Sequence, residues 1–166
     1  MGIEIERKFL LKTDSWRDCA QSRSRIIQGY ISVNPAATVR VRLTASGAFL
    51  TLKGKRRNYS ATEFEYPVPA QDAATMLEQM SLHPPIDKWR YLVSYADNLW
   101  EIDEFTGPNA GLIIAEIELK SVTAEFEHPP WLGEEVSDDP RYFNASLVQQ
   151  PYSTWDSQVR MDKTGC

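Results

Sequence analysis

The stretch Glu4-Ile5-Glu6-Arg7-Lys8 carries charged side chains at every second position. Successive side chains of a β-strand point to opposite faces, so Glu4, Glu6 and Lys8 share one face while Ile5 lies on the other. Two carboxylates two residues apart repel each other unless a cation lies between them. Taken alone, this stretch fits a solvated edge strand better than a strand that binds a divalent metal ion.

Same-sign charges recur with this spacing along the chain. A solvated strand face accepts charges in any order, so the recurrence predicts a shared and highly charged interior. Asp103 is interpreted as a lone acid on its strand. The same-sign pairs lie in Arg40-Val41-Arg42, Lys53-Gly54-Lys55, Glu63-Phe64-Glu65, Lys88-Trp89-Arg90 and Glu116-Ile117-Glu118.

Composition favours an ordinary globular chain. The 166 residues are 42% hydrophobic and 25% charged, which is enough for one domain with one core; we expect a single domain over residues 1–166 with a polar tail from about residue 151. The net charge of −5 argues against a nucleic-acid partner. No apolar run approaches the ~18 residues that span a bilayer, and no signal peptide is evident, so we expect no membrane partner. The oligomeric state stays open.

Cysteine and histidine are scarce, with two of each. Two cysteines do not form a disulfide framework and are typical of a reducing cytoplasm, where we expect the protein to act. The histidines precede proline pairs, in probable turn sequences. Zinc bound by Cys and His is therefore excluded, and any metal must be bound by oxygen, which favours Mg²⁺ or Mn²⁺.

Hydrophobic periodicity predicts a mainly β (α+β) chain. Helix 71–80 should bury Ala73, Met76, Leu77 and Met80, which recur at helical spacing. Short helices are expected after Thr123 and near 144–149, with a helix or loop at 15–23. Charged strand faces that point toward one another close most simply as an eight-stranded antiparallel β-barrel with peripheral helices. The eight strands are predicted at 2–11, 26–33, 38–44, 48–55, 62–68, 86–95, 99–106 and 113–122.

Burying unpaired ions costs several kcal/mol each, so a charged barrel interior needs a physical reason. Ion pairing among the side chains is one explanation. A polyanion bound by the bases and a divalent cation bound by the acids is another, and phosphoryl transfer uses both components. The sequence contains no P-loop and no nucleophile elbow. The acids are Glu4, Glu6, Glu63, Glu65, Asp103, Glu116 and Glu118, and the bases are Lys8, Arg40, Arg42, Lys53, Lys88 and Arg90.

From residue 3 to about 150 the chain resembles the triphosphate tunnel metalloenzyme (CYTH) superfamily. The resemblance implies an eight-stranded barrel whose hydrophilic tunnel binds a triphosphate. It is carried by Glu4-Ile5-Glu6-Arg7-Lys8-Phe9, Gln28-Gly29-Tyr30, Val39-Arg40-Val41-Arg42, Leu50-Thr51-Leu52-Lys53-Gly54, Glu63-Phe64-Glu65-Tyr66, Lys88-Trp89-Arg90-Tyr91, Ala115-Glu116-Ile117-Glu118-Leu119 and Arg141-Tyr142-Phe143-Asn144, in that order.

The resemblance also implies roles for single residues. The bases named above would bind the phosphates. Lys8 and Tyr30 resemble a pair that activates water in some members, and Glu65 and Asp103 are further catalytic candidates. The metal ligands would be Glu4, Glu6 and Glu118 with Glu116 beside them, and a second metal or the attacking water would be held by Glu63, Glu65 and Asp103.

One position departs from the family pattern. The family commonly has Arg two residues before the first Glu of Glu63-Phe64-Glu65, and this chain has Ala61. Arg56 or Arg57 in the preceding loop is a candidate to reach the same space.

Several functions fit these residues. Metal-dependent hydrolysis of inorganic triphosphate to pyrophosphate and phosphate is the leading hypothesis. Within the family, a nucleoside or thiamine triphosphatase or a class IV adenylyl cyclase is the alternative, with Trp16, Trp89 or Trp100 stacking on a base, although aromatic residues in strands are more often core. A non-catalytic polyphosphate-binding module is the alternative of another class.

Overall fold

The computed structural model describes residues 2–156. The helices are α1 (Ala70–Gln79) and α2 (Asn144–Leu147), with 3-10 turns η1 (Ser15–Cys19), η2 (Gly107–Asn109), η3 (Pro140–Tyr142) and η4 (Tyr152–Thr154). The strands are β1 (Gly2–Leu11), β2 (Ala20–Asn34), β3 (Ala37–Thr44), β4 (Gly47–Gly54), β5 (Ser60–Val68), β6 (Ile86–Tyr95), β7 (Asn98–Phe105), β8 (Ile113–Glu118) and β9 (Leu132–Glu135).

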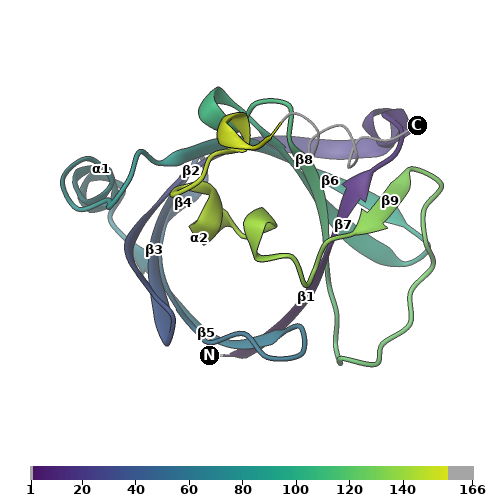
Figure 1. Cartoon of the computed structure of the whole chain (residues 1–166), viewed down its shortest axis with the longest axis horizontal. Coiled ribbons are helices and arrows are strands. Elements are labelled where there is room, and N and C mark those ends of the chain that lie inside the picture. Colours follow the sequence, from purple (N-terminus) through teal and green to yellow (C-terminus); the bar gives the residue numbers. More distant parts are fainter. Residues whose placement is uncertain (1, 157–166) are drawn as a thin grey trace.

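The strands form a closed antiparallel barrel in the order β5-β4-β3-β2-β6-β7-β8-β1 (Figure 1). β1 closes it by changing partners along its length. Gly2 to Ile5 pair with β5, and Glu6 to Leu10 pair with β8. The short strand β9 pairs with the end of β1, at Phe9 and Leu11. The predicted eight-stranded antiparallel barrel is therefore confirmed.

Strand register places the charged side chains on the inner face. Residues directly opposite each other in an antiparallel pair point to the same side of the sheet. Lys8 of β1 lies opposite Glu116 of β8, and Arg90 of β6 lies opposite Asp103 of β7. Along β1 the inward side chains change from acidic, through Lys8, to the apolar Leu10. The alternation in the sequence correctly predicted the shared charged interior.

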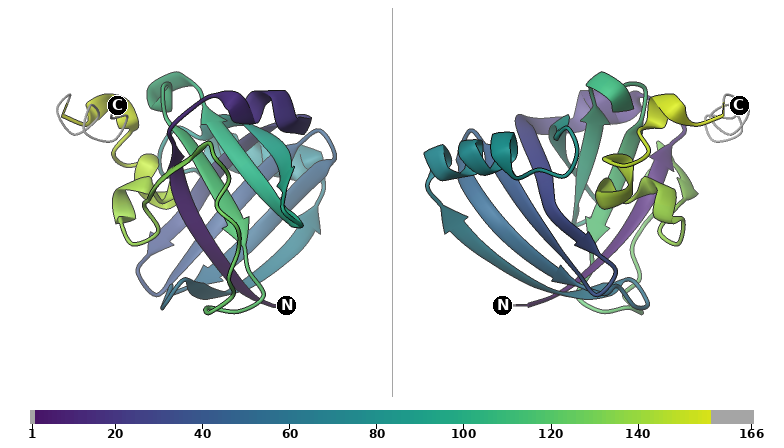
Figure 2. Two further views of the ribbon diagram at one scale, coloured as in Figure 1. Left: turned by 90° about the vertical axis from the view of Figure 1, so that its right-hand side faces the viewer. Right: turned by 60° about the vertical axis from the view of Figure 1, so that its left-hand side comes forward.

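Apolar side chains cover the outer face in two places. Helix α1 lies outside the barrel (Figure 2) and buries Ala73 and Leu77 against β3 and β4. The predicted inner position of Met80 is wrong: its side chain is 53% exposed, because the helix ends at Gln79. The second outer cluster is centred on aromatic residues between the barrel and the segment 119–131, and includes Trp16, Trp100 and Trp131.

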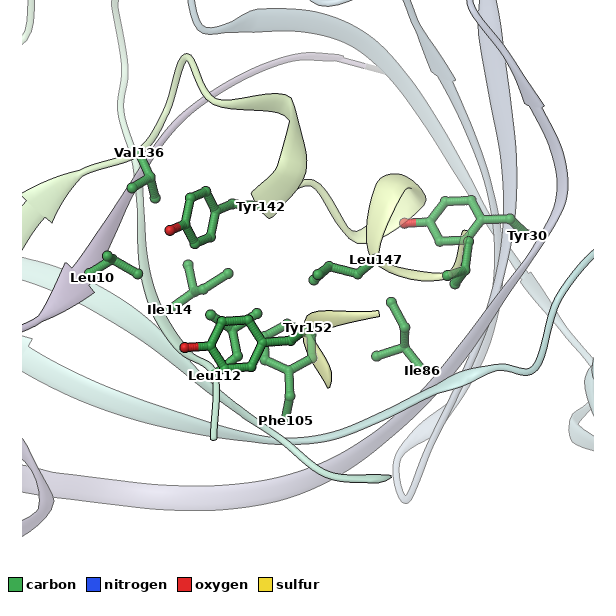
Figure 3. Packing of buried hydrophobic residues seen from close by; sticks show 11 residues of the cluster. Leu10, Tyr30, Ile86, Phe105, Leu112, Ile114, Val136, Tyr142, Leu147 and Tyr152 are labelled. Atoms are coloured by element: carbon green, nitrogen blue, oxygen red, sulfur yellow. The ribbon is translucent and has the colours of Figure 1, made fainter. Parts of the chain in front are cut away.

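A third apolar cluster closes one end of the barrel from inside (Figure 3). Leu147 of α2 packs there with inward-facing Tyr30, Phe105 and Ile114. Tyr152 is also buried in this cluster. The predicted polar tail therefore does not begin at Pro151, and residues 157–166 lie outside the described part of the chain.

Two predicted boundaries are wrong for identifiable reasons. β2 begins at Ala20 instead of residue 26, because the polar run up to Arg25 pairs with β6 through its backbone and has no apolar alternation. β8 ends at Glu118, and the helix predicted after Thr123 is absent from the described residues; the segment 119–131 crosses the outer face without regular structure.

Among residues 2–156, no helix has the length and apolar character needed to span a membrane.

Gly133 lies where β9 approaches the backbone of β1 closely. A Cβ at this position would lie 2.8 Å from the backbone oxygen of Leu10, a contact that backbone atoms cannot relieve cheaply. We expect Gly133→Ala to lower the free energy of unfolding by about 1–3 kcal/mol, the usual cost of overpacking. Urea unfolding followed by tryptophan fluorescence measures this change.

Gly54→Ala is the matched control, because a Cβ there meets its nearest atom at an ordinary 3.7 Å. Equal effects of the two substitutions would contradict the close approach of β9 to β1.

Candidate active site

Carboxylates gather around Lys53 near the beginning of β1. The Lys53 ammonium donates to the carboxylate of Glu4 and to Glu6 Oε1, the latter at 3.3 Å, and Glu63 Oε2 lies 4.0 Å away. Glu118 lies opposite Glu6 in the pairing of β1 with β8. These four acids, Glu4, Glu6, Glu63 and Glu118, are called the carboxylate cluster below.

Repulsion within the carboxylate cluster appears in its pKa values. Burial raises the pKa of Glu118, and the charges of Glu4 and Glu6 raise it further. Burial and the charge of Glu4 likewise raise the pKa of Glu63. Burial also opposes ionisation of Glu6, but Lys8, Lys53 and Arg56 together hold its pKa well below the usual range. Cations close to the carboxylate cluster are therefore needed to keep Glu6 charged.

The carboxylate cluster has the donor chemistry of a hard divalent cation. All its ligating atoms are carboxylate oxygens, which Mg²⁺ and Mn²⁺ prefer. Within residues 2–156, Glu63 Oε2 is buried and accepts no hydrogen bond. No three acidic, His or Cys side chains of the described residues already converge as a metal site. The oxygen donors and the orphaned acceptor fit a divalent metal, whose ligands would be drawn from the cluster.

Basic side chains dominate the interior between the carboxylate cluster and the apolar end. Lys88 and Arg90 both bind the fully buried Asp103, at 2.7 Å each. Burial opposes ionisation of Asp103, but Arg90 and Lys88 lower its pKa to about 2. Burial lowers the pKa of Lys88 to about 8 despite the carboxylate of Asp103. Lys88 also donates to Oδ1 of Asn144 in α2, at 3.2 Å.

Arg42 differs from the other inward-facing bases. Its guanidinium donates to Gln28 Oε1 at 3.2 Å and forms no ion pair with any residue of the described chain. Burial lowers the pKa of Arg42, and the neighbouring charges of Arg40 and Arg90 lower it further, to about 10. Ion pairing among side chains therefore leaves one inward cation uncompensated.

Lys8 belongs to the ion-paired set. Its Nζ lies 2.5 Å from Glu116 Oε1 and 3.7 Å from Glu6 Oε1. Burial disfavours the Lys8 ammonium, but Glu116 and Glu6 outweigh it and raise its pKa. Burial also opposes ionisation of Glu116, which Lys8 counters, so its pKa falls to about 2. Glu116, counted among the candidate metal ligands, thus faces Lys8.

The remaining site residues predicted from the sequence are Glu65 and Tyr30. Glu65 accepts a hydrogen bond from the Thr51 hydroxyl at 3.0 Å and lies 3.5 Å from Arg40. Tyr30 lies in the apolar cluster beside α2 (Figure 3), and no contact in residues 2–156 joins it to Lys8. The proposed pairing of Lys8 with Tyr30 stays a prediction.

The interpretation of Asp103 as a lone acid is wrong. Glu101 lies on the same face, opposite Glu116, and its carboxylate is 2.5 Å from Arg90. The sequence contained a signal for Glu101, because Glu101-Ile102-Asp103 has the same two-residue spacing of acids as the other strands. Asn144 had no such signal, because it reaches Lys88 from α2 and not from a strand.

The structure also locates the position that departs from the family pattern. Ala61 lies opposite Glu4, so its small side chain faces the interior, where it is buried. Arg56 reaches the interior from the loop between β4 and β5, with Nη1 3.2 Å from Glu6 Oε1. Arg57 is exposed. Of the two candidate arginines, Arg56 contacts the site residues.

Comparison with known proteins agrees with this geometry. The profile of the CYTH domain matches residues 2–152. The chain belongs to the CYTH family. It is 42% identical over 155 residues to a protein named inorganic triphosphatase from Acetivibrio thermocellus, covering 93% of this chain and 99% of that protein.

A protein named inorganic triphosphatase from Nitrosomonas europaea is 34% identical to this CYTH chain over 158 residues, covering 87% of this chain and 96% of that protein. The crystal structure of the inorganic triphosphatase NE1496 superposes with a TM-score of 0.64 at 32% identity. That superposition covers 87% of this chain and 97% of the solved one.

Asp103 should stabilise the barrel as well as the site. Its folded pKa of about 2 lies below the ordinary value of 3.8, so its contribution of about 2 kcal/mol is present above pH ~4 and is lost as the pH falls toward 2. Asp103→Asn should cost about 3–5 kcal/mol at pH 7, because Lys88 and Arg90 stay buried without their partner. Urea unfolding at pH 7 measures this loss, and a series of unfolding curves from pH 5 to pH 2 measures the acid-dependent part.

Asp97→Asn in the exposed turn between β6 and β7 is the control. An Asp103→Asn variant with the same acid-dependent loss of stability as the parent protein would contradict this assignment.

Proposed function

We propose that this chain is a metal-dependent inorganic triphosphatase, which hydrolyses tripolyphosphate to pyrophosphate and phosphate. The observation that carries the proposal is Arg42. This inward cation forms no ion pair within residues 2–156 and lies beside Arg40 and Arg90, so an anion is needed to balance the group. A guanidinium group binds phosphate oxygens through two parallel hydrogen bonds. The names of the two relatives support the same reaction.

The basic side chains would bind the phosphates. Arg40, Arg42, Lys88 and Arg90 extend from β3 and β6, between the apolar end and the carboxylate cluster. The Glu65 and Glu101 side chains are 38% and 41% exposed, so water reaches both sides of this region. A triphosphate bound here would lie with one end toward Lys88 and the other toward Lys53.

Glu4, Glu6, Glu118 and Glu63 would hold a divalent cation, Mg²⁺ or Mn²⁺. Such an ion, when bound, neutralises charge on phosphate oxygens and orients them for in-line attack. The side chains of this protein would bind the phosphates and position the attacking water. Lys8 has a raised pKa, so it stays charged and suits phosphate binding better than proton removal. Glu65, which accepts from Thr51, is the carboxylate we assign to positioning the attacking water.

Nucleotide substrates have less support. Trp16 and Trp100, two candidates for stacking on a base, are fully buried in the outer cluster and cannot reach a ligand inside the barrel. The third, Trp89, lies next to Arg23 at 4.1 Å from ring centre to guanidinium carbon and belongs to the outward face of β6. Location in the cytoplasm stays a prediction.

Phosphate release tests the proposal directly. The purified protein is assayed with tripolyphosphate, ATP, thiamine triphosphate, pyrophosphate and long-chain polyphosphate, each with Mg²⁺, Mn²⁺ or EDTA. We expect turnover to be fastest on tripolyphosphate and to stop in EDTA. Cyclic AMP formed from ATP would favour the cyclase alternative. Metal-independent binding of polyphosphate without any turnover would favour the non-catalytic alternative and contradict the proposal.

Glu6→Gln should abolish metal-dependent turnover. The amide cannot carry the negative charge that Lys8, Lys53 and Arg56 surround, and it is a poor ligand for a hard cation. We expect kcat to fall by at least about a hundredfold while the variant still folds, as judged by circular dichroism, with a lower melting temperature because three cations lose a charged partner. Glu78→Gln on the exposed face of α1 is the control. Unchanged turnover would remove Glu6 from the metal site.

Arg42→Ala should raise the KM for tripolyphosphate by about 10- to 100-fold, since a hydrogen bond to a charged group contributes about 1.5–3 kcal/mol. Because Arg42 is a partly buried cation without an ionic partner, its removal should leave the free energy of unfolding unchanged or increase it. Initial rates and urea unfolding measure the two effects. A normal KM, or a loss of stability comparable to that of Asp103→Asn, would contradict the role given to Arg42.

A further inference from the structure

The loop 55–59 between β4 and β5 holds Glu6 at three points. Glu6 lies where β1 changes partners, one residue after the last pair with β5. Its backbone N–H donates to the carbonyl of Tyr59 at 3.1 Å. Its carbonyl accepts from Arg56 Nη2 at 2.7 Å, and its carboxylate accepts from Arg56 Nη1 at 3.2 Å. The loop thus takes over the backbone groups of Glu6 at the point where β5 no longer pairs with β1.

The loop is shaped to direct Arg56 inward. Asn58 and Tyr59 adopt left-handed backbone conformations, with φ of 47° and 67°, and Arg57 and Ser60 bond to each other through their backbones at 2.8 and 3.0 Å. This tight turn turns Arg57 outward and leaves Arg56 on the inner side. The Arg56 guanidinium also lies 5.5 Å from the ring centre of Phe143, the residue before α2. Contacts on several sides therefore fix the direction of the guanidinium.

The cations around Glu6 all approach the same oxygen. Arg56, Lys53 and Lys8 lie 3.2, 3.3 and 3.7 Å from Glu6 Oε1. Within residues 2–156, Oε2 accepts no hydrogen bond from these cations. Of the three cations, Arg56 alone also bonds to the backbone of Glu6, so it fixes the rotation of the side chain relative to β1. A carboxylate held in this way presents its second oxygen in one direction.

We infer that Arg56 is a positioning residue that orients Glu6 for metal binding. This inference rests on the proposed function, because it takes Glu6 as a ligand of the divalent cation. Hydrogen-bonded partners of metal ligands typically contribute about 10- to 100-fold to metal affinity. Arg56 acts here through Glu6 and does not touch the metal. Its role requires both donors of the guanidinium fork, one on the carboxylate and one on the carbonyl oxygen.

Charge and position predict opposite effects when Arg56 is removed. A cation beside a metal site repels the metal, so by charge alone Arg56→Ala would strengthen metal binding. Loss of the orientation of Glu6 would weaken it. The sign of the change in affinity therefore distinguishes a positioning residue from a charge that only neutralises Glu6.

The experiment titrates the full-length protein with Mn²⁺ in the absence of phosphate compounds, and free Mn²⁺ is followed by its electron paramagnetic resonance signal. We expect Arg56→Ala to raise the dissociation constant by about 10- to 100-fold. Arg56→Lys keeps the charge but not the two-pronged contact, and should give an intermediate value. Arg57→Ala, which removes the same charge from the exposed neighbour, should leave the constant unchanged.

Three outcomes have distinct meanings. Mn²⁺ affinity of Arg56→Ala equal to or tighter than that of Arg57→Ala would overturn the inference. If Arg56→Ala does not fold, as judged by circular dichroism, Arg56→Lys decides, and parent-like affinity of that variant would overturn the inference equally. Glu6→Gln is measured in the same series. If Glu6→Gln binds Mn²⁺ as tightly as the parent protein, the metal site of the proposed function is refuted. If Glu6→Gln loses affinity and the Arg56 variants do not, only the role of Arg56 is refuted.

Discussion

Charges that point into a closed barrel must be compensated, and this requirement organises the protein. The antiparallel pairing places acids and bases directly opposite or diagonal to one another, as Lys8 with Glu116 and Arg90 with Asp103. Each such pair offsets the desolvation of its members, and removal of one partner leaves the other buried without compensation. The barrel is therefore stable only with a nearly complete set of internal ion pairs.

The compensation is incomplete in two places, and these are the places where ligands are expected. Arg42 is a cation without an ionic partner in the described chain. In the carboxylate cluster, burial and the neighbouring acids together raise the pKa of Glu118 and Glu63. The region around Arg42 lacks negative charge, and the carboxylate cluster lacks positive charge. A triphosphate and a divalent cation bound together supply both. The apolar cluster around Leu147 closes the end beyond Lys88 and keeps bulk water from that side.

The sequence predicted the barrel because its charged side chains repeat every second residue, and this spacing has the same meaning in every strand. The same rule would have found Glu101. It does not find Arg56 or Asn144, which reach the interior from a loop and from α2, since no periodicity relates these segments to the strands. The start of β2 at Ala20 was missed because its polar residues pair with β6 without any apolar alternation. The position of α2 at the apolar end of the barrel was not predicted either, because it depends on packing between distant parts of the chain.

Anomalous X-ray diffraction at the manganese edge would locate the metal and the phosphates inside the barrel. A crystal is soaked with Mn²⁺ and a tripolyphosphate analogue whose bridging oxygens are replaced by imido groups, so that hydrolysis is slow. We expect a manganese peak within ligand distance of Glu4, Glu6 and Glu118, with the phosphate density extending from it toward Arg42 and Lys88. A manganese peak at Asp103 and Glu116, or phosphate density outside the barrel, would contradict the proposed binding of metal and triphosphate.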